Sequence, residues 1–287
     1  MKVIQHKKNV HEVQLEGNKC TIALFSDIHW DNPQCDRELL EKHLNYCLEN
    51  SIPIFINGDL LCIMQGRFDR RASKTKLRPE HQTEHYFDSI VETAYEYFKP
   101  YAHLICVIGY GNHETSIIKH HETDLLQRLV DYINLREGTH IKTGGYSGWI
   151  VFRLFHVNNK ASFNMHYHHG LSKGGSPVTK GAIDLTRAMS MYENMDIFTQ
   201  GHIHQTMTRT DVRDQLVYKQ GYKVEPRVIT HVITGTYKDE YFKAHGMGWH
   251  VERGAEPRNI GGKLLHLSSK KVQSKTNKQI DISKFPL

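Results

Sequence analysis

The stretch CTIALFSDIHW, residues 20–30, joins an apolar run to a cluster of polar side chains. The apolar residues 21–25 predict a short buried strand that ends where the polar cluster begins. Residues two apart in an extended segment point to the same side, so Asp27 and His29 present a carboxylate and an imidazole together. This pair suits a divalent first-row metal, which makes the strand end a candidate ligand site.

The same pattern occurs twice more in the first half of the chain, and helical stripes of apolar residues separate the three apolar runs. Strands are expected at 21–25, 52–56 and 104–108, and helices at 36–49, at about 81–98 and from about 121. Repeated strand–helix units predict an α/β fold. In such folds ligands bind at the C-terminal ends of the strands, where the polar clusters of this chain lie.

The second half of the chain has a different pattern. Residues 149–169 and 227–234 are strand-like, and a helix is expected at about 180–192. We therefore predict a second, more antiparallel sheet and a four-layer α-β-β-α sandwich of two mixed sheets, with a metal site at the C-terminal edges of the strands. Residues 1–267 are expected to form one domain. The lysine-rich residues 268–287 are expected to form a basic, polar tail that is mobile or laid along the surface.

Composition places the 287-residue chain among ordinary globular proteins, with 39% hydrophobic and 24% charged residues. No apolar run is long enough to span a membrane, and the N-terminus does not resemble a signal peptide, so we expect a cytoplasmic protein. The five cysteines form no CxxC pair and are expected to be reduced thiols. The net charge of +6 is compatible with a polyanionic partner without establishing one.

Histidines follow two further apolar runs. The stretch FTQGHIHQTM, residues 198–207, holds His202 and His204, either as a pair of metal ligands or as a surface loop of a chain that contains 21 histidines. The stretch SFNMHYHHGLS offers a choice of histidines that includes His168 and His169. Asp59 is suited to bridge two cations with its two oxygens, and two adjacent cations form a clamp for a phosphoryl group.

Five short segments, in this order along the chain, resemble the motifs of the calcineurin-like metallophosphoesterase superfamily. They are Asp27-Ile28-His29, Gly58-Asp59, Gly111-Asn112-His113-Glu114, His169-Gly170 and Gly201-His202-Ile203-His204. The resemblance covers residues 21 to about 210. Two later stretches, GGSPVTKGAI and TGTYKDEYF, are similar to the bacteriophage-encoded branch of this superfamily.

The resemblance implies a role for each motif residue. One metal would be held by Asp27, His29, Asp59 and His204, and a second by Asp59, Asn112, His169 and His202. Asp59 would bridge the two metals. His113 would bind no metal and would act on the phosphate, either by stabilising charge or by protonating the leaving oxygen. Glu114 and Asp31 would orient histidine rings. The position before the glycine favours His169 over His168 as a ligand.

Substrate contacts are suggested by several basic or polar residues, each with an ordinary alternative. Arg67 and Arg71 belong to a basic loop that either contacts a phosphate backbone or is a solvated charge run. Lys180 follows a glycine-rich turn at a helix start, which suits an anion or is only a turn. Tyr237 and Lys238 follow an apolar run and are candidates for the same edge.

We therefore expect a phosphoesterase with two divalent metals, Mn²⁺ first and Fe, Zn, Co or Ni as alternatives. The favoured substrate is a phosphodiester in DNA, RNA or a nucleotide, as for a phage nuclease in the host cytoplasm. A phosphomonoesterase acting on proteins or small molecules is the alternative enzyme. A binding or scaffold protein without turnover is the alternative from another class. The sequence does not indicate the oligomeric state.

Overall fold

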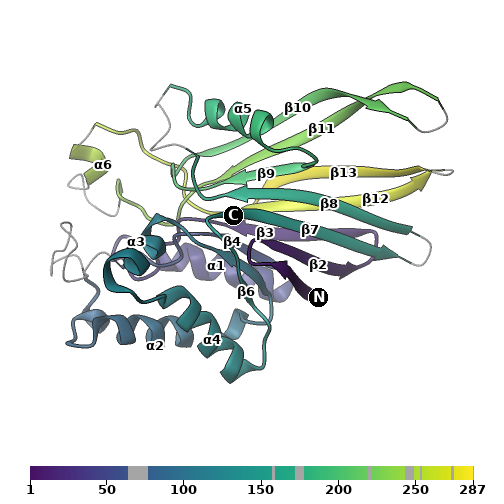
Figure 1. Cartoon of the computed structure of the whole chain (residues 1–287). Coiled ribbons are helices and arrows are strands. Elements are labelled where there is room, and N and C mark those ends of the chain that lie inside the picture. The colour runs from purple at the N-terminus through teal and green to yellow at the C-terminus, as the bar shows by residue number, and fades with distance from the viewer. Residues whose placement is uncertain are drawn as a thin grey trace.

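Two β-sheets pack face to face, with helices on both outer sides, in the computed structural model of the chain (Figure 1). The structure describes residues 1–63, 77–156, 159–171, 178–218, 221–242, 249–252, 254–272 and 275–286. All statements below concern these residues.

The first sheet has six strands in the order β13-β12-β3-β4-β5-β6. Its strands are β3 (Lys19–Phe25), β4 (Ile54–Asn57), β5 (Ile105–Gly109), β6 (Lys142–Thr143), β12 (Lys263–Val272) and β13 (Lys275–Lys284). Strands β3 to β6 are parallel, so the polar segments after β3, β4 and β5 meet at one edge. β12 pairs with β3 in the antiparallel direction, which makes the sheet mixed.

The second sheet has seven strands in the order β1-β2-β7-β8-β9-β11-β10 and is also mixed. Its strands are β1 (Lys2–Lys7), β2 (Val10–Glu16), β7 (Ser147–His156), β8 (Asn159–His168), β9 (Ile197–Gln200), β10 (Thr206–Val217) and β11 (Lys223–Thr234). The N-terminal hairpin of β1 and β2 was not anticipated from the sequence. β8 and β9 are parallel, so His169 and the segment after β9 also lie at one edge.

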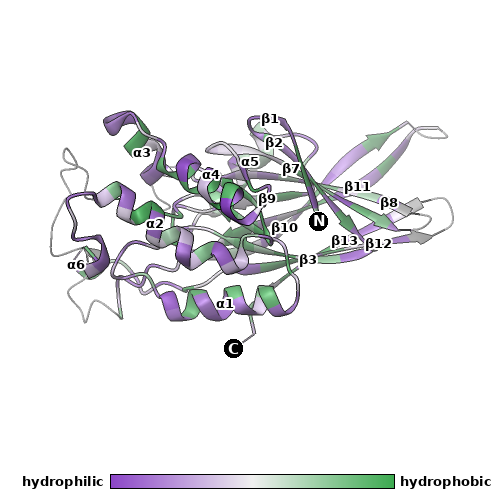
Figure 2. Ribbon diagram, turned by 90° about the horizontal axis from the view of Figure 1, so that it is seen from below, coloured by the Kyte–Doolittle hydropathy of each residue, from purple (hydrophilic) through white to green (hydrophobic). Residues whose placement is uncertain are grey.

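The helices form the outer layers. They are α1 (Arg37–Glu49), α2 (Tyr86–Phe98), α3 (Asn112–His121), α4 (Leu125–Glu137), α5 (Ala182–Met191) and α6 (Trp249–Glu252), with two short 3-10 turns, η2 (Pro79–His81) and η3 (Lys99–Tyr101). Helices α1, α2 and α4 carry mixed hydrophobic and hydrophilic residues along their length (Figure 2). The helix expected from about 121 corresponds to α4, which begins at Leu125. Helix α3, which begins within the predicted motif at Asn112 and ends at His121, was not expected from the sequence.

Three groups of buried apolar side chains hold the layers together. One packs α1, α2 and α4 on the six-stranded sheet, with Leu44 and Phe98 among its members. A second lies between the sheets and includes Phe55, Phe152 and Phe163. A third packs α5 on β9 and β11. The predicted α-β-β-α arrangement of two mixed sheets is confirmed, although α5 supplies most of the outer layer on the seven-stranded side.

The residues from 268 onward do not form a separate tail. Residues 268–272 complete β12, and β13 runs antiparallel to it at the edge of the six-stranded sheet. The side chains of Ile280 and Ile282 pack on the core between the sheets, and Phe285 is buried beside Phe25, with ring centroids 5.6 Å apart. Widely spaced apolar side chains, set among lysines, therefore suffice to anchor this segment.

None of the helices in the described part of the chain has the length and apolar character needed to span a bilayer.

Candidate metal centre

The predicted ligand residues converge at one edge of the two sheets. Asp27 follows β3, Asp59 follows β4 and His169 follows β8, while Asn112 begins α3 after β5. His202 and His204 lie between β9 and β10. Segments far apart in the chain thus meet, such as those of His29 and His204, which are 175 residues apart, because the C-terminal ends of parallel strands share an edge.

The first ligand group consists of Asp27, His29 and His204, whose ligand atoms all lie within 4.8 Å of one another. The Nε2 atom of His204 is 3.2 Å from Oδ1 of Asp27 and 3.3 Å from Nε2 of His29. Asp27 and His29 are buried, and His204 is partly buried. One carboxylate and two imidazoles at this spacing match the donor set that divalent first-row metals accept.

The second group consists of Asp59, His169 and His202, again within 4.8 Å of one another. The Oδ2 atom of Asp59 is 3.2 Å from Nε2 of His169, and that nitrogen is 3.2 Å from Oδ1 of Asn112. Asp59 Oδ2 also lies 3.9 Å from Nε2 of His29. Asp59 therefore lies between the two groups.

The buried charges of this cluster fit a cation. Asp27 Oδ1 is buried and lies 3.2 Å from Nε2 of His204 and 4.0 Å from Nε2 of His169. Burial opposes ionisation of Asp59, but His169 and His113 outweigh it and hold the pKa of this carboxyl well below its usual range. Burial would lower the pKa of His169, but Asp59 and Asp27 outweigh it and raise this pKa to about 10. Two buried carboxylates that attract positive charge this strongly suit metal ions.

The backbone at the centre is held in an unusual conformation. Asp27, His29, Asp59, His202 and His204 all have positive φ angles, between 49° and 66°. This left-handed region is uncommon for residues other than glycine and costs free energy at each position. Such strained residues cluster at functional sites, so the pattern favours a ligand role for these five side chains.

Glycines allow two of the carboxylates to approach the neighbouring backbone. A Cβ atom added to Gly111 would lie 2.0 Å from Oδ1 of Asp59. A Cβ atom added to Gly201 would lie 2.6 Å from Oδ2 of Asp27. Both distances are far inside van der Waals contact, so these motif glycines are needed for space.

Glu114 and Asp31 hold the backbone, whereas the sequence resemblance implied that they orient histidine rings. Glu114 Oε2 accepts hydrogen bonds from the backbone N–H groups of Asp59, at 3.1 Å, and Gly111, at 2.9 Å. Burial and the neighbouring Asp59 raise the pKa of Glu114 to about 8. Asp31 accepts from the backbone N–H of Ile63 at 2.9 Å. The two acids thus fix the loop that carries Asp59.

Backbone carbonyl groups orient the rings instead. His169 Nδ1 donates to the carbonyl oxygen of Asn57 at 2.8 Å, which turns Nε2 toward Asp59. His113 Nδ1 donates to the carbonyl oxygen of Cys62. This bond turns His113 Nε2 toward the centre, where it lies 3.9 Å from Oδ2 of Asp59.

His168 and His169 occupy different environments. His169 is fully buried within the ligand cluster. The ring of His168 lies against Tyr146 at a centroid distance of 5.4 Å, and burial lowers the pKa of His168 to about 4. The geometry favours His169 as the ligand, as the motif does, and the ligand roles themselves remain predictions.

The residues predicted to contact the substrate lie in different environments. Lys238 lies close enough to the centre for its charge to act on His29, and it pairs with Glu240 at 2.7 Å. Burial would lower the pKa of Lys238, but neighbouring Cys62 and Glu240 outweigh it and raise this pKa. Lys180 is half-exposed and pairs with Glu256 at 2.9 Å. Arg67 and Arg71 lie outside the described residues.

Tyr237 corrects the expectation of a substrate contact. Its side chain is fully buried in the core under β3. Its hydroxyl group accepts a hydrogen bond from the backbone N–H of Gly262 at 3.0 Å and lies 2.8 Å from Nδ1 of His43. A side chain enclosed in this way supports the core and has no surface for a substrate.

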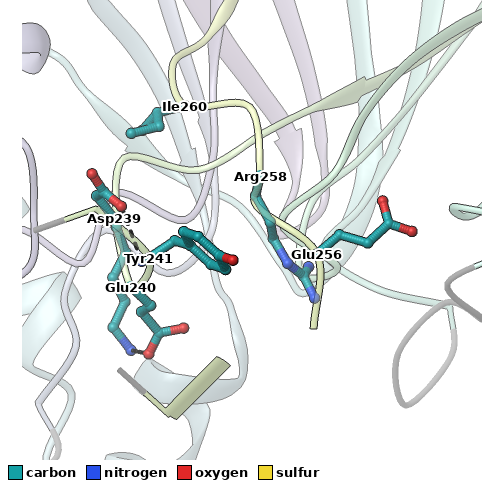
Figure 3. Close-up of a pocket in the computed structure, with 7 residues that line it drawn as sticks. Asp239, Glu240, Tyr241, Glu256, Arg258 and Ile260 are labelled. Carbon is teal, nitrogen blue, oxygen red and sulfur yellow. Dashed lines mark hydrogen bonds and ion pairs between the residues drawn. The ribbon is translucent and has the colours of Figure 1, made fainter. Parts of the chain in front are cut away.

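Several neighbours of the centre carried no sequence signal. Cys62 lies with His29 and His113 in a third group of closely spaced donor atoms. A pocket beside Lys238 is lined by residues from two segments, 238–241 and 256–260 (Figure 3). One of these, Arg258, donates a hydrogen bond from Nη1 to the carbonyl oxygen of Ile203, between His202 and His204.

Comparisons with known proteins give structural neighbours and no sequence match. No protein-family profile matches the chain, and no curated protein matches it. One neighbour is vacuolar protein sorting 29 from Cryptosporidium parvum, with a TM-score of 0.37, 12% identity, and coverage of 93% of this chain and 100% of that chain. Another is GAP50, the anchor in the inner membrane complex of Plasmodium, with a TM-score of 0.44, 10% identity, and coverage of 93% and 89%.

A double mutant of vacuolar protein sorting 29 from Entamoeba histolytica is a third neighbour, with a TM-score of 0.32, 12% identity, and coverage of 93% and 99%. At these TM-scores and identities, the neighbours leave the family of this chain open.

Proposed function

We propose that this protein is a metal-dependent phosphodiesterase of the calcineurin-like superfamily, of the phage-encoded type, acting on nucleic acid or nucleotides in the cytoplasm. One observation carries the proposal: Asp59 Oδ2 lies between two groups of ligand side chains, 3.2 Å from His169 and 3.9 Å from His29. A carboxylate so placed suits a bridge between two adjacent cations.

Two divalent cations fit the donor set. Asp27, His29 and His204 would hold one of them, His169, His202 and Asn112 the other, and Asp59 would contact both. When bound, such a pair neutralises phosphoryl oxygens and activates water at neutral pH. The mixed carboxylate and imidazole ligands suit Mn²⁺ and also accept Fe, Zn, Co or Ni.

His113 would act on the substrate directly. Its Nδ1 proton is committed to the carbonyl oxygen of Cys62, so Nε2 is the atom that faces the centre. Protonated at Nε2, the ring donates a hydrogen bond to a phosphoryl oxygen or a proton to the leaving oxygen. His113 also donates its backbone N–H to Asp59 Oδ1 at 3.0 Å, which fixes the ring relative to the bridging carboxylate.

The charged surroundings support an anionic substrate. Lys238 is nearly buried and pairs with Glu240, and the neighbouring Cys62 and Glu240 raise its pKa in spite of burial. The chain as a whole has a net charge of +6. Both features favour a phosphate ester that belongs to a polyanion, since basic residues neutralise backbone phosphates. The diester is our choice over the monoester because of this charge and the resemblance to phage-encoded sequences.

The test compares substrates on one preparation. The purified protein is loaded with Mn²⁺ and assayed with bis-p-nitrophenyl phosphate, p-nitrophenyl phosphate, single- and double-stranded DNA, and RNA. We expect turnover of the diester and of at least one nucleic acid. Turnover of the monoester alone would assign a phosphomonoesterase. A complete lack of turnover with Mn²⁺, Fe²⁺, Zn²⁺, Co²⁺ and Ni²⁺ would assign a binding or scaffold protein.

A further inference from the structure

The hairpin of β10 and β11 carries an apolar surface that no other described element covers. Both of its strands continue past the end of β9, which pairs only with residues 230–233 of β11 (Figure 1). Cross-strand partners share a face, and on one face Val212 stands opposite Val228 and Leu216 opposite Val224. These side chains are 63%, 49%, 49% and 67% exposed, respectively. Paired exposed aliphatic residues on one strand face mark an interaction surface.

The same hairpin ends the sheet. β10 is the last strand in the order, so one side of its 12-residue backbone has no partner strand within the described chain. A long edge strand with exposed aliphatic residues is a template for pairing with another strand. The opposite face of the hairpin is covered near its base, where Arg209 reaches Thr186 of α5. The free edge and the apolar face therefore belong to one surface.

Strand β10 carries opposite charges at Asp211 and Arg213, and in its own chain Asp211 also pairs with Arg209 at 2.7 Å and with His231 at 3.1 Å. Asp211 and Arg213 flank Val212 and point to the face opposite Val212. When two copies of β10 run antiparallel with Val212 opposite itself, Asp211 of each copy lies opposite Arg213 of the other. A register centred on Asp211 or on Arg213 would instead place like charges opposite each other, which is unfavourable. Arg213 also stands opposite Arg227 within its own hairpin, so an added carboxylate would offset that repulsion.

We propose that two copies of this chain associate through antiparallel pairing of their β10 strands, centred on Val212. The pairing joins the two seven-stranded sheets across a two-fold axis. Each copy supplies the same surface, as in the isologous interfaces of most homodimers. Val212 of both copies, with Leu216 of each beside Thr208 of the other, forms one apolar band.

This register has a consequence for the metal centre that rests on the proposed function. Tyr218, which is 71% exposed, falls opposite Thr206 of the other copy, two residues from His204. The ring of Tyr222 packs beside that of Tyr218, with the two ring centroids 5.5 Å apart. An aromatic pair at this position would offer a stacking surface to a base next to the scissile phosphate.

Cross-linking tests the register without any activity. Directly opposed residues have Cα atoms about 4.5–5.5 Å apart, which suits a disulfide. Val212→Cys should therefore form a disulfide-linked dimer under mild oxidation. Leu216→Cys is the matched control, since in this register the two copies of Leu216 lie roughly 27 Å apart along the strands. Equal cross-linking of both variants, or none with Val212→Cys, would overturn the proposal.

Sedimentation velocity tests the association itself. The unmodified protein should sediment as a dimer, and Arg213→Asp should weaken dimerisation at least tenfold. The combined variant Asp211→Arg/Arg213→Asp should restore it, because the charges are exchanged within the same register. Leu135→Arg on α4, where Leu135 is 82% exposed, is the control for adding a charge to an exposed aliphatic site. A monomer at the highest soluble concentration would refute the proposed association.

Discussion

Asp59 Oδ2 lies 3.2 Å from the Nε2 atom of His169, and both side chains are almost completely buried. The same oxygen is 3.9 Å from a ring nitrogen of His29 and 3.9 Å from one of His113. A single carboxylate oxygen thus faces both candidate ligand groups and the histidine that belongs to neither. Substitutions at these positions should separate metal binding from catalysis.

Asp59→Asn should remove activity together with bound metal. The amide keeps the size of the side chain but loses the negative charge that would hold two cations. We expect metal content, measured by elemental analysis after dialysis, to fall from near two ions per chain to below one. Activity should fall by at least about 100-fold. Retention of two ions by the variant would contradict the bridging role.

His113→Ala should remove activity and leave the metal in place. The ring faces the centre through Nε2, yet it belongs to neither of the two main ligand groups. Loss of a proton donor of this kind typically lowers kcat by 10²–10⁴-fold, and about that effect is expected here. Elemental analysis of the same preparation should still find near two ions. Metal loss equal to that of Asp59→Asn would mean that His113 is a ligand.

Gly111→Ala should disturb the centre through sterics alone. The added methyl group would lie 2.0 Å from Asp59 Oδ1, so the Asp59 loop has to move. Overpacking of this kind costs about 1–3 kcal/mol, which chemical denaturation can measure. Metal affinity should fall as well.

Gly138→Ala is the control for that substitution. A Cβ atom there meets no atom within 4 Å, although φ is +63°. It should cost roughly 1 kcal/mol from backbone strain and leave metal affinity unchanged. Unchanged metal affinity in Gly111→Ala would show that Asp59 tolerates displacement.

The strand ends and their polar clusters were predictable because each depends on a few neighbouring residues. An apolar run followed by Asp, His or Gly marks a strand end in the sequence. Parallel strands then bring these ends together at one edge of the sheet. Side-chain direction beyond the strand was not predictable in the same way. Tyr237 and Lys238 are adjacent, yet Tyr237 lies in the core, whereas Lys238 pairs with Glu240 and lines a pocket. Side chains alternate between the two faces of an extended segment, and the sequence alone does not show which of two adjacent residues points into the core.

The C-terminal strand was missed for a different reason. Residues 275–284 contain lysines and polar residues, and only Ile280 and Ile282 mark the buried face. Pairing with β12 satisfies the backbone of β13, so the segment needs few apolar contacts to be ordered. The register of an added edge strand depends on its neighbour, which a pattern within the segment does not reveal.

His43 contacts this C-terminal segment and should make the stability of the fold depend on pH. Its ring stacks on Phe285 at a centroid distance of 4.1 Å, and Nδ1 lies 2.8 Å from the hydroxyl of Tyr237. Burial, followed by the charge of Lys42, lowers the pKa of His43 to about 4 from 6.5. The unfolded chain therefore binds a proton more readily, so the free energy of unfolding should decrease as pH falls from about 6.5 to about 4.

His43→Gln should flatten this part of the pH dependence. The lowered pKa of His43 contributes at most about 3 kcal/mol to the free energy of unfolding. This contribution is present above pH 6.5 and is lost near pH 4. Urea unfolding between pH 7 and pH 4 measures the difference between the variant and the unmodified protein. Other buried histidines, such as His11 and His231, have lowered pKa values too and contribute equally to both proteins. His103→Gln, at an exposed position, is the control and should leave the profile unchanged. A variant that keeps the full decrease would show that the contact between His43 and Phe285 does not couple the C-terminal segment to pH.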